Sequence, residues 1–137
     1  MKKFLTLFLL FILMVALSGC KPKKPKAIIL FNKYPITKEN FLNNSTEFDT
    51  QKRIYYVYMT EKGIRTDKIR VKVFKRESKA RDSITKLVYC HDFKMKYDNI
   101  YYYTDYIVLH TAGDYCMMVF QMDRLDKPDA YADLRVK

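Results

Sequence analysis

The segment KIRVKVFKR, residues 68–76, alternates along its length between apolar and charged side chains. Its β-branched residues take every second position and basic residues separate them: Ile69, Val71 and Val73 against Arg70 and Lys72. Successive side chains of a β-strand point to opposite faces of a sheet, so the alternation indicates one buried face and one solvated face. The segment therefore predicts a half-buried strand.

Further strands are predicted on both sides of this segment. Each is rich in β-branched or aromatic residues, and together they cover residues 27–31, 53–60, 83–93, 99–110, 114–122 and 131–136. Gly63 marks a hairpin turn within EKGIRT, and Ala112-Gly113 marks a second turn. The one helical turn that we expect covers residues 37–43, with Thr37 as its cap. Short strands at this spacing are typical of an all-β protein, and we predict a small antiparallel β-sandwich.

The first nineteen residues are typical of an export signal. Lys2 and Lys3 supply a positive start, and an apolar run from Phe4 to Ala16 follows. This run is shorter than the roughly 20 residues that a membrane-spanning helix needs. We therefore expect residues 1–19 to be a signal helix that is cleaved, and the mature protein to be exported.

Leu17-Ser18-Gly19-Cys20 resembles the lipobox of bacterial lipoproteins, which signal peptidase II cuts just before the cysteine. The resemblance implies that Cys20 becomes the first residue and carries covalent lipid, a diacylglyceryl group and often a further acyl chain such as palmitate. Each buried methylene adds about 0.8 kcal/mol, so two or three chains hold a small protein on a bilayer. The alternative is an ordinary exported protein that is cut elsewhere and keeps a free Cys20.

The resemblance also implies a location. The protein is expected on the cell membrane or, in a Gram-negative host, on the outer membrane facing the periplasm, because Lys21 is not the aspartate that retains lipoproteins in the inner membrane. After Cys20, the segment KPKKPK (residues 21–26) is typical of an extended tether, at roughly 3 Å per residue. Its lysines either lie near anionic headgroups or serve only as a solvated spacer.

The last quarter of the chain resembles the final hairpin of immunoglobulin-like domains in bacterial surface proteins. The segments that carry the likeness are AGDYCMMVF, a loop beginning DRLDKPDA, and the terminal ADLRV. The resemblance implies an immunoglobulin-like sandwich and says nothing of function. The length of residues 27–137 predicts one domain. The chain has no Trp, so the Cys…Trp…Cys core of antibody domains is absent.

Residue patterns that carry chemistry are few. The sequence contains no Gly-x-Ser-x-Gly, no His-Glu-x-x-His and no phosphate-binding loop. Cys90, His91 and Asp92 are adjacent, and neighbours in a strand point to opposite faces, so they do not converge on one metal ion. The acidic residues of DRLDKPD, Asp123 and Asp126, indicate a polar turn. We therefore predict no catalytic residue, no metal, and no cofactor beyond the lipid on Cys20.

Two cysteines remain after Cys20. Export favours a disulfide between Cys90 and Cys116, and burial of free thiols is the competing interpretation. Either cysteine could also form a nucleophilic pair with His110, which is the basis for an alternative function as a small envelope hydrolase.

Positive charge is concentrated in the middle of the chain. Residues 50–96 have a net charge of +9, whereas residues 97–137 have a net charge of −3. We predict a basic face for an anionic partner, formed by Lys62, Arg65, Arg70, Lys72 and Arg76. Such a face attracts phosphorylated lipid headgroups, an anionic envelope polymer or an acidic protein. The alternative is an ordinary solvated face or a charged edge that resists aggregation.

These observations predict a membrane-anchored bacterial envelope lipoprotein that carries a non-catalytic β-sandwich, used as a binding or structural module. The bilayer is its first partner, through the acylated Cys20. The twelve tyrosines favour strands, and although exposed ones could stack on sugars or bases, nucleic acid is not expected outside the cytoplasm. The alternatives are the small hydrolase and an inhibitor or accessory subunit of an envelope enzyme or surface complex.

Overall fold

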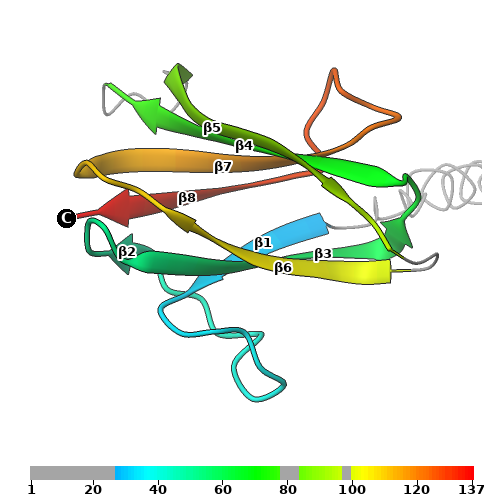
Figure 1. Ribbon diagram of the computed structural model, residues 1–137, viewed down its shortest axis with the longest axis horizontal. Coiled ribbons are helices and arrows are strands. Elements are labelled where there is room, and N and C mark those ends of the chain that lie inside the picture. Colours follow the sequence, from blue (N-terminus) through cyan, green and yellow to red (C-terminus); the bar gives the residue numbers. More distant parts are fainter. Residues whose placement is uncertain (1–26, 78–83, 97–99) are drawn as a thin grey trace, which may run out of the picture.

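Two layers of β-sheet make up the computed structural model of the protein (Figure 1). The structure describes residues 27–77, 84–96 and 100–137. The signal segment, Cys20 and the tether lie outside the described residues. Within the described ranges, no helix is long and apolar enough to cross a membrane.

The smaller layer has three antiparallel strands. They are β1 (Ala27–Asn32), β3 (Arg53–Ile64) and β6 (Ile100–Val108), in the order β1-β3-β6. Ala27 pairs with Thr60, so the chain enters the sheet beside the far part of β3. This pairing fixes which end of the sandwich the tether joins.

The larger layer has five strands. They are β2 (Glu47–Phe48), β4 (Lys68–Arg76), β5 (Ile84–Lys94), β7 (Gly113–Gln121) and β8 (Ala130–Val136), in the order β2-β8-β7-β4-β5. The pairs are antiparallel except that β2 runs parallel to β8. The order β8-β7-β4-β5 corresponds to the G-F-C-C′ sheet of an immunoglobulin variable domain.

The core lies between the two layers, and every second side chain of β4 and of β3 points into it. Ile69, Val71 and Val73 of β4 are fully buried, as the sequence predicts. From the opposite layer, Ile54, Tyr56 and Tyr58 of β3 face them, each with 0% exposure. Side chains of opposite faces thus share one core, and the predicted all-β sandwich is confirmed. All residues of this core cluster lie between Ile29 and Val136.

One local prediction differs from the structure, and another is found. β3 does not turn at Gly63 but continues to Ile64, and the left-handed φ of 77° at Gly63 accommodates a register shift between Met59 and Ile64. At residues 37–43 the expected helical turn is present as a single turn, in which the amide of Phe41 donates to the Thr37 carbonyl at 3.0 Å. The Asn40 side chain accepts from the Thr37 amide at 2.7 Å, as the residue three positions after a cap does in a capping box, so Thr37 takes the position at which the turn begins.

Candidate functional site

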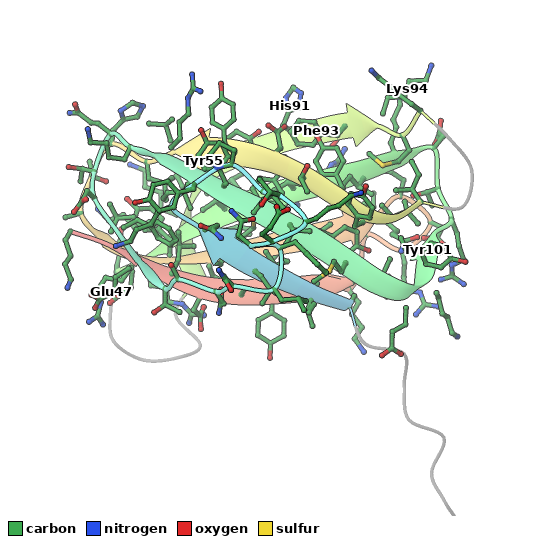
Figure 2. The ribbon with its side chains drawn as sticks, turned by 90° about the horizontal axis from the view of Figure 1, so that it is seen from below. Glu47, Tyr55, His91, Phe93, Lys94 and Tyr101 are labelled. Atoms are coloured by element: carbon green, nitrogen blue, oxygen red, sulfur yellow. The ribbon has the colours of Figure 1, made fainter. Side chains whose placement is uncertain are left out.

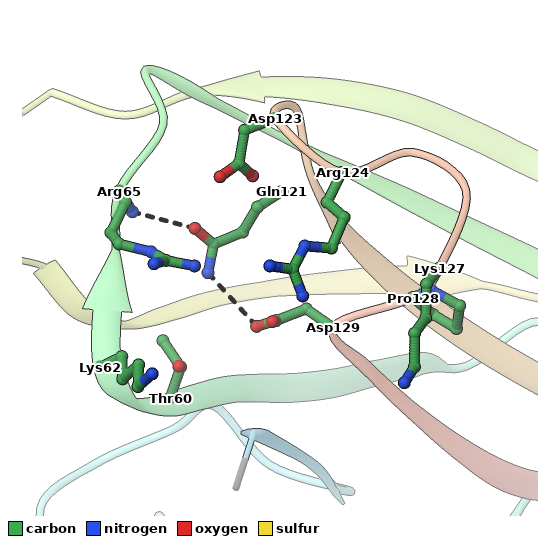
Figure 3. Close-up of a pocket in the computed structure, with 9 residues that line it drawn as sticks. All are labelled: Thr60, Lys62, Arg65, Gln121, Asp123, Arg124, Lys127, Pro128 and Asp129. Carbon is green, nitrogen blue, oxygen red and sulfur yellow. Dashed lines mark hydrogen bonds between the residues drawn. The ribbon is translucent and has the colours of Figure 1, made fainter. Parts of the chain in front are cut away.

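A pocket of about 360 Å³ opens at the end of the sandwich where β1 begins (Figure 3). The end of β3 forms one side and the loop from β7 to β8, residues 122–129, forms the other. We call it the end pocket, and its lining residues are Thr60, Lys62, Arg65, Gln121, Asp123, Arg124, Lys127, Pro128 and Asp129. Its volume lies in the range of small-ligand sites.

Gln121 forms the floor of the end pocket and is held on all sides. Its side-chain oxygen accepts from the backbone amide of Arg65 at 3.0 Å. Its side-chain nitrogen lies 3.2 Å from the hydroxyl of Tyr58, 3.3 Å from a carboxylate oxygen of Asp129 and 3.5 Å from the carbonyl of Gly63. Gln121 is only 4% exposed, so these bonds satisfy a buried amide and fix the two sides of the pocket together.

Asp129 is also occupied by this network. The Tyr58 hydroxyl donates to its carboxylate. Burial and this hydrogen bond raise the pKa of Tyr58 well above its ordinary value, so the phenol stays protonated and remains a donor at neutral pH. The charge of Asp129 is therefore turned toward the floor of the pocket and stabilised there by two donors.

Basic side chains surround the opening. Figure 3 shows the guanidinium groups of Arg65 and Arg124 extending toward the same space beside Gln121, with Lys62 and Lys127 farther out. No carboxylate of the described residues lies within 4.0 Å of the charged nitrogens of these four side chains. The four cations exceed the two lining carboxylates, so the pocket carries a net positive charge that favours an anion.

The predicted basic face separates into two groups in the structure. Arg70, Lys72 and Arg76 lie on the outer face of the five-stranded sheet, where they pair across strands with Phe120, Met118 and Asp114 of β7. Lys62 and Arg65 line the end pocket instead. The five residues therefore do not form one surface.

Acidic neighbours balance much of the charge on the outer face. Arg70 makes a bidentate pair with Asp92, at 2.7 and 2.9 Å. Arg76 donates to Asp133 at 2.7 Å. The Lys72 ammonium lies 5.2 Å from the centre of the Phe120 ring, within the range of a cation–π contact. Of the predicted residues, Lys62 and Arg65 are thus the two that line a pocket, while Lys72 keeps its charge on the outer face beside Phe120.

Sequence reasoning missed the partners of Lys62 and Arg65. Arg124 and Lys127 belong to the loop DRLDKPD, whose acidic residues indicated only a polar turn. Gln121 lies 56 residues from Arg65 along the chain, and its role depends on the pairing of β4 with β7. The sequence shows that Arg124 and Lys127 are two basic residues in one loop. Only the fold shows that this loop lies beside the end of β3.

The two cysteines lie on different strands and in different surroundings. Cys90 on β5 is exposed and Cys116 on β7 is buried, and both are free thiols in the structure. β4 lies between β5 and β7, with Lys72 opposite Cys90 and Phe74 opposite Cys116. Strands are about 4.8 Å apart, so an intervening strand places the two cysteines beyond the usual reach of a disulfide. Burial raises the pKa of the Cys116 thiol to about 11.

The residues Cys90, His91 and Asp92 do not converge. Cys90 and Asp92 lie opposite Lys72 and Arg70, while His91 belongs to the other face of β5. There its ring packs beside Phe93 with ring centres 4.6 Å apart (Figure 2). Among the described residues, no three His, Cys, Asp or Glu side chains are grouped so that they could hold a metal ion.

Comparisons with known proteins identify the fold. No protein-family model matches the chain, and no curated protein has a significantly similar sequence. An immunoglobulin-like protein from Pseudomonas aeruginosa has a similar structure, with a TM-score of 0.50 and 14% identity over 80% of this chain and 91% of that one. This likeness confirms the predicted immunoglobulin-like sandwich and shows the fold alone.

Two other solved structures are less similar. A CARDB domain from Pyrococcus furiosus, in complex with di-metal ions, has a TM-score of 0.39 and 12% identity, and the match covers 85% of this chain and 96% of that one. A beta-glucosidase from Kluyveromyces marxianus, in complex with glucose, has a TM-score of 0.39 and 14% identity, over 87% of this chain but 14% of that one. At these scores neither bears on the function of this chain.

Proposed function

We propose that the chain is an exported lipoprotein, anchored to a membrane through the acylated Cys20. Its immunoglobulin-like domain is a non-catalytic binding module held at the membrane surface. The observation that carries the proposal is the short distance in sequence between the lipobox cysteine and the first strand. Only residues 21–26 separate Cys20 from β1, which begins at Ala27.

The position of β1 gives this proposal a geometric consequence. An extended tether of this length spans roughly 20 Å, so the end of the domain where β1 begins stays close to the lipid. The end pocket lies at that same end, because its lining residue Thr60 pairs with Ala27. The anchored protein therefore presents its basic pocket toward the membrane and not toward the space beyond it.

A binding role also suits the side chains that could otherwise act as nucleophiles. With a pKa near 11, the Cys116 thiol is protonated at neutral pH, whereas a nucleophilic cysteine needs a lowered pKa. Cys116 is 1% exposed and is covered by Arg76 and Asp133 on the outer face of the sheet, so no substrate reaches its sulfur. Immunoglobulin-like sandwiches present loops and pockets at their ends, and the end pocket is of this kind.

Replacing the lipobox cysteine tests the anchoring. We expect Cys20→Ser to abolish the lipid adduct seen by mass spectrometry and to move the protein out of the membrane fraction or leave it uncleaved. Cys90→Ser is the matched control, since it removes an exposed cysteine outside the lipobox. The control variant should carry the same lipid mass as the unmodified chain. If the Cys20→Ser protein is still cut before residue 20 and still sediments with membranes, the chain is not a lipoprotein.

A further inference from the structure

We propose that the end pocket binds a phosphate group, and that in the anchored protein this group belongs to the headgroup of an anionic phospholipid. That the ligand is a phosphate group is inferred from the pocket alone. That the phosphate belongs to a lipid rests on the proposed membrane anchoring. It assigns a ligand class to Arg65 and Arg124.

The chemistry of the two arginines supports phosphate. A guanidinium group presents several N–H donors in a planar fork that matches the oxygens of phosphate, and two such groups from opposite sides can share one anion. Arg65 follows the end of β3 and Arg124 lies in the loop 122–129, so the ligand would bridge the two sides of the pocket. In the described part of the chain, neither guanidinium has a carboxylate partner that would have to be displaced.

The floor of the pocket keeps this arrangement in place before a ligand arrives. Gln121 holds the backbone of Arg65 by a 3.0 Å hydrogen bond and lies 3.3 Å from Asp129, which follows the loop that carries Arg124. Asp129 accepts hydrogen bonds from Tyr58 and Gln121, which hold its carboxylate in place. Asp123 and Asp129 are the two carboxylates of the lining, and the four basic side chains outweigh them. A preorganised site loses less entropy on binding.

The place of the pocket favours a headgroup as the source of the phosphate. It opens where β1 begins, at the end of the domain from which the seven residues 20–26 lead to the bilayer. Figure 1 shows the orange loop 122–129 extending from the ends of β7 and β8 at this end of the sandwich. The four tether lysines add to the same field near an anionic surface.

The test uses the full chain purified in a neutral detergent, with two probes. Inorganic phosphate represents the free anion, and phosphatidylglycerol added to the detergent micelles represents the headgroup. Binding is followed by NMR through the backbone amide of residue 65 and the side-chain amide of Gln121, which all the variants keep. We expect saturable shifts with phosphatidylglycerol at lower concentration than with inorganic phosphate, and weaker binding as salt shortens the screening length from its ~10 Å at 0.1 M.

Matched variants separate the pocket from general charge. Arg65→Gln with Arg124→Gln should weaken binding about tenfold or more, because two charge-assisted contacts are lost. Lys33→Gln with Lys52→Gln removes the same charge at the opposite end of the sandwich, after β1 and before β3, and should keep the affinity within about twofold. The guanidinium groups are exposed, and the Arg65 bond to Gln121 uses the backbone, so the first variant retains the fold.

The outcomes distinguish this inference from the anchoring. Tighter binding of inorganic phosphate than of phosphatidylglycerol would keep the phosphate site and overturn the headgroup as its source. No saturable shift with either probe up to about 10 mM, or an equal loss in both double variants, would overturn the phosphate site itself. Neither result depends on whether Cys20 carries lipid, which the fractionation of Cys20→Ser decides separately.

Discussion

Removing one buried hydroxyl should make this protein more stable. Tyr56 has 0% exposure, and its hydroxyl has no hydrogen-bond partner among the described residues. A buried hydroxyl without a partner loses its water hydrogen bonds on folding and costs about 1–3 kcal/mol. Tyr56→Phe removes this cost and leaves the ring in the core. We therefore expect the free energy of unfolding to rise by about 1–2 kcal/mol.

Tyr115 provides the matched control for this substitution. It is buried to the same degree, with 1% exposure, but its hydroxyl donates to the Thr111 carbonyl at 2.6 Å and lies 2.8 Å from the Thr111 hydroxyl. Tyr115→Phe removes a hydrogen bond and leaves the Thr111 carbonyl without this donor. We expect it to lower the free energy of unfolding by about 1 kcal/mol.

Urea unfolding of residues 27–137, followed by circular dichroism, measures both changes. The chain has no Trp, so the strand signal serves better than fluorescence. Thermal unfolding of the same proteins also separates the two variants, because for a domain of this size each kcal/mol moves the thermal midpoint by roughly 4–8 °C. The reasoning is refuted if both substitutions change stability with the same sign, because then the hydrogen bond of the hydroxyl does not decide the effect.

Three further predictions concern the thiols, alkaline pH and the pocket floor. At pH 8 a maleimide should modify Cys90 quickly and Cys116 only after denaturation, giving two reactive thiols in unreduced, denatured residues 27–137; fewer than two would indicate a disulfide. Burial raises the pKa of Cys116 from 9.0 to about 11, so the thiol stabilises the fold below pH 9 and this contribution is lost as the pH rises toward 11. The urea midpoint of the unmodified domain should therefore fall more steeply over that interval than the midpoint of Cys116→Ala, and parallel curves would contradict the raised pKa. Gln121→Ala should lower the free energy of unfolding by about 2–4 kcal/mol, since it leaves the Arg65 amide and the Tyr58 hydroxyl short of a partner, whereas the exposed Gln51→Ala should change it far less.

Local sequence patterns predict the strands because the burial of each side chain in a strand is reflected in its residue type. In β4 the side chains of Ile69, Val71 and Val73 are apolar for the same reason that they are buried, so the alternation carries the answer within nine residues. The prediction for β7, residues 114–122, agrees with the observed Gly113–Gln121 because the segment contains a continuous run of apolar residues that is buried almost throughout. The two-residue strand β2 was missed, since Glu47 and Phe48 are too few to show a period.

The end pocket could not be predicted in this way because its residues meet only through the register of strands that are distant in sequence. Lys62 and Arg65 were expected to share a face with Arg70, as neighbours in a hairpin. The continuation of β3 through Gly63 carries them instead to the end of the sandwich, beside the loop after β7. Charge alone therefore identified two of the four basic residues, and the fold supplied Arg124 and Lys127.

The parallel pairing of β2 with β8 also determines how the domain responds to mechanical force. β1 begins at one end of the long axis, and the C-terminal residue Lys137 lies at the other (Figure 1). A pull on these two points draws β2 and β8 past one another, so the bonds from Arg135 to Thr46 and from Lys137 to Phe48 are strained in shear and must break together. A pull applied to the two ends of the edge strand β5 would instead peel its pairs from β4 one after another. Single-molecule extension should therefore need a larger force along the first direction, and a domain tethered at β1 resists unfolding best when tension reaches it through its last strand.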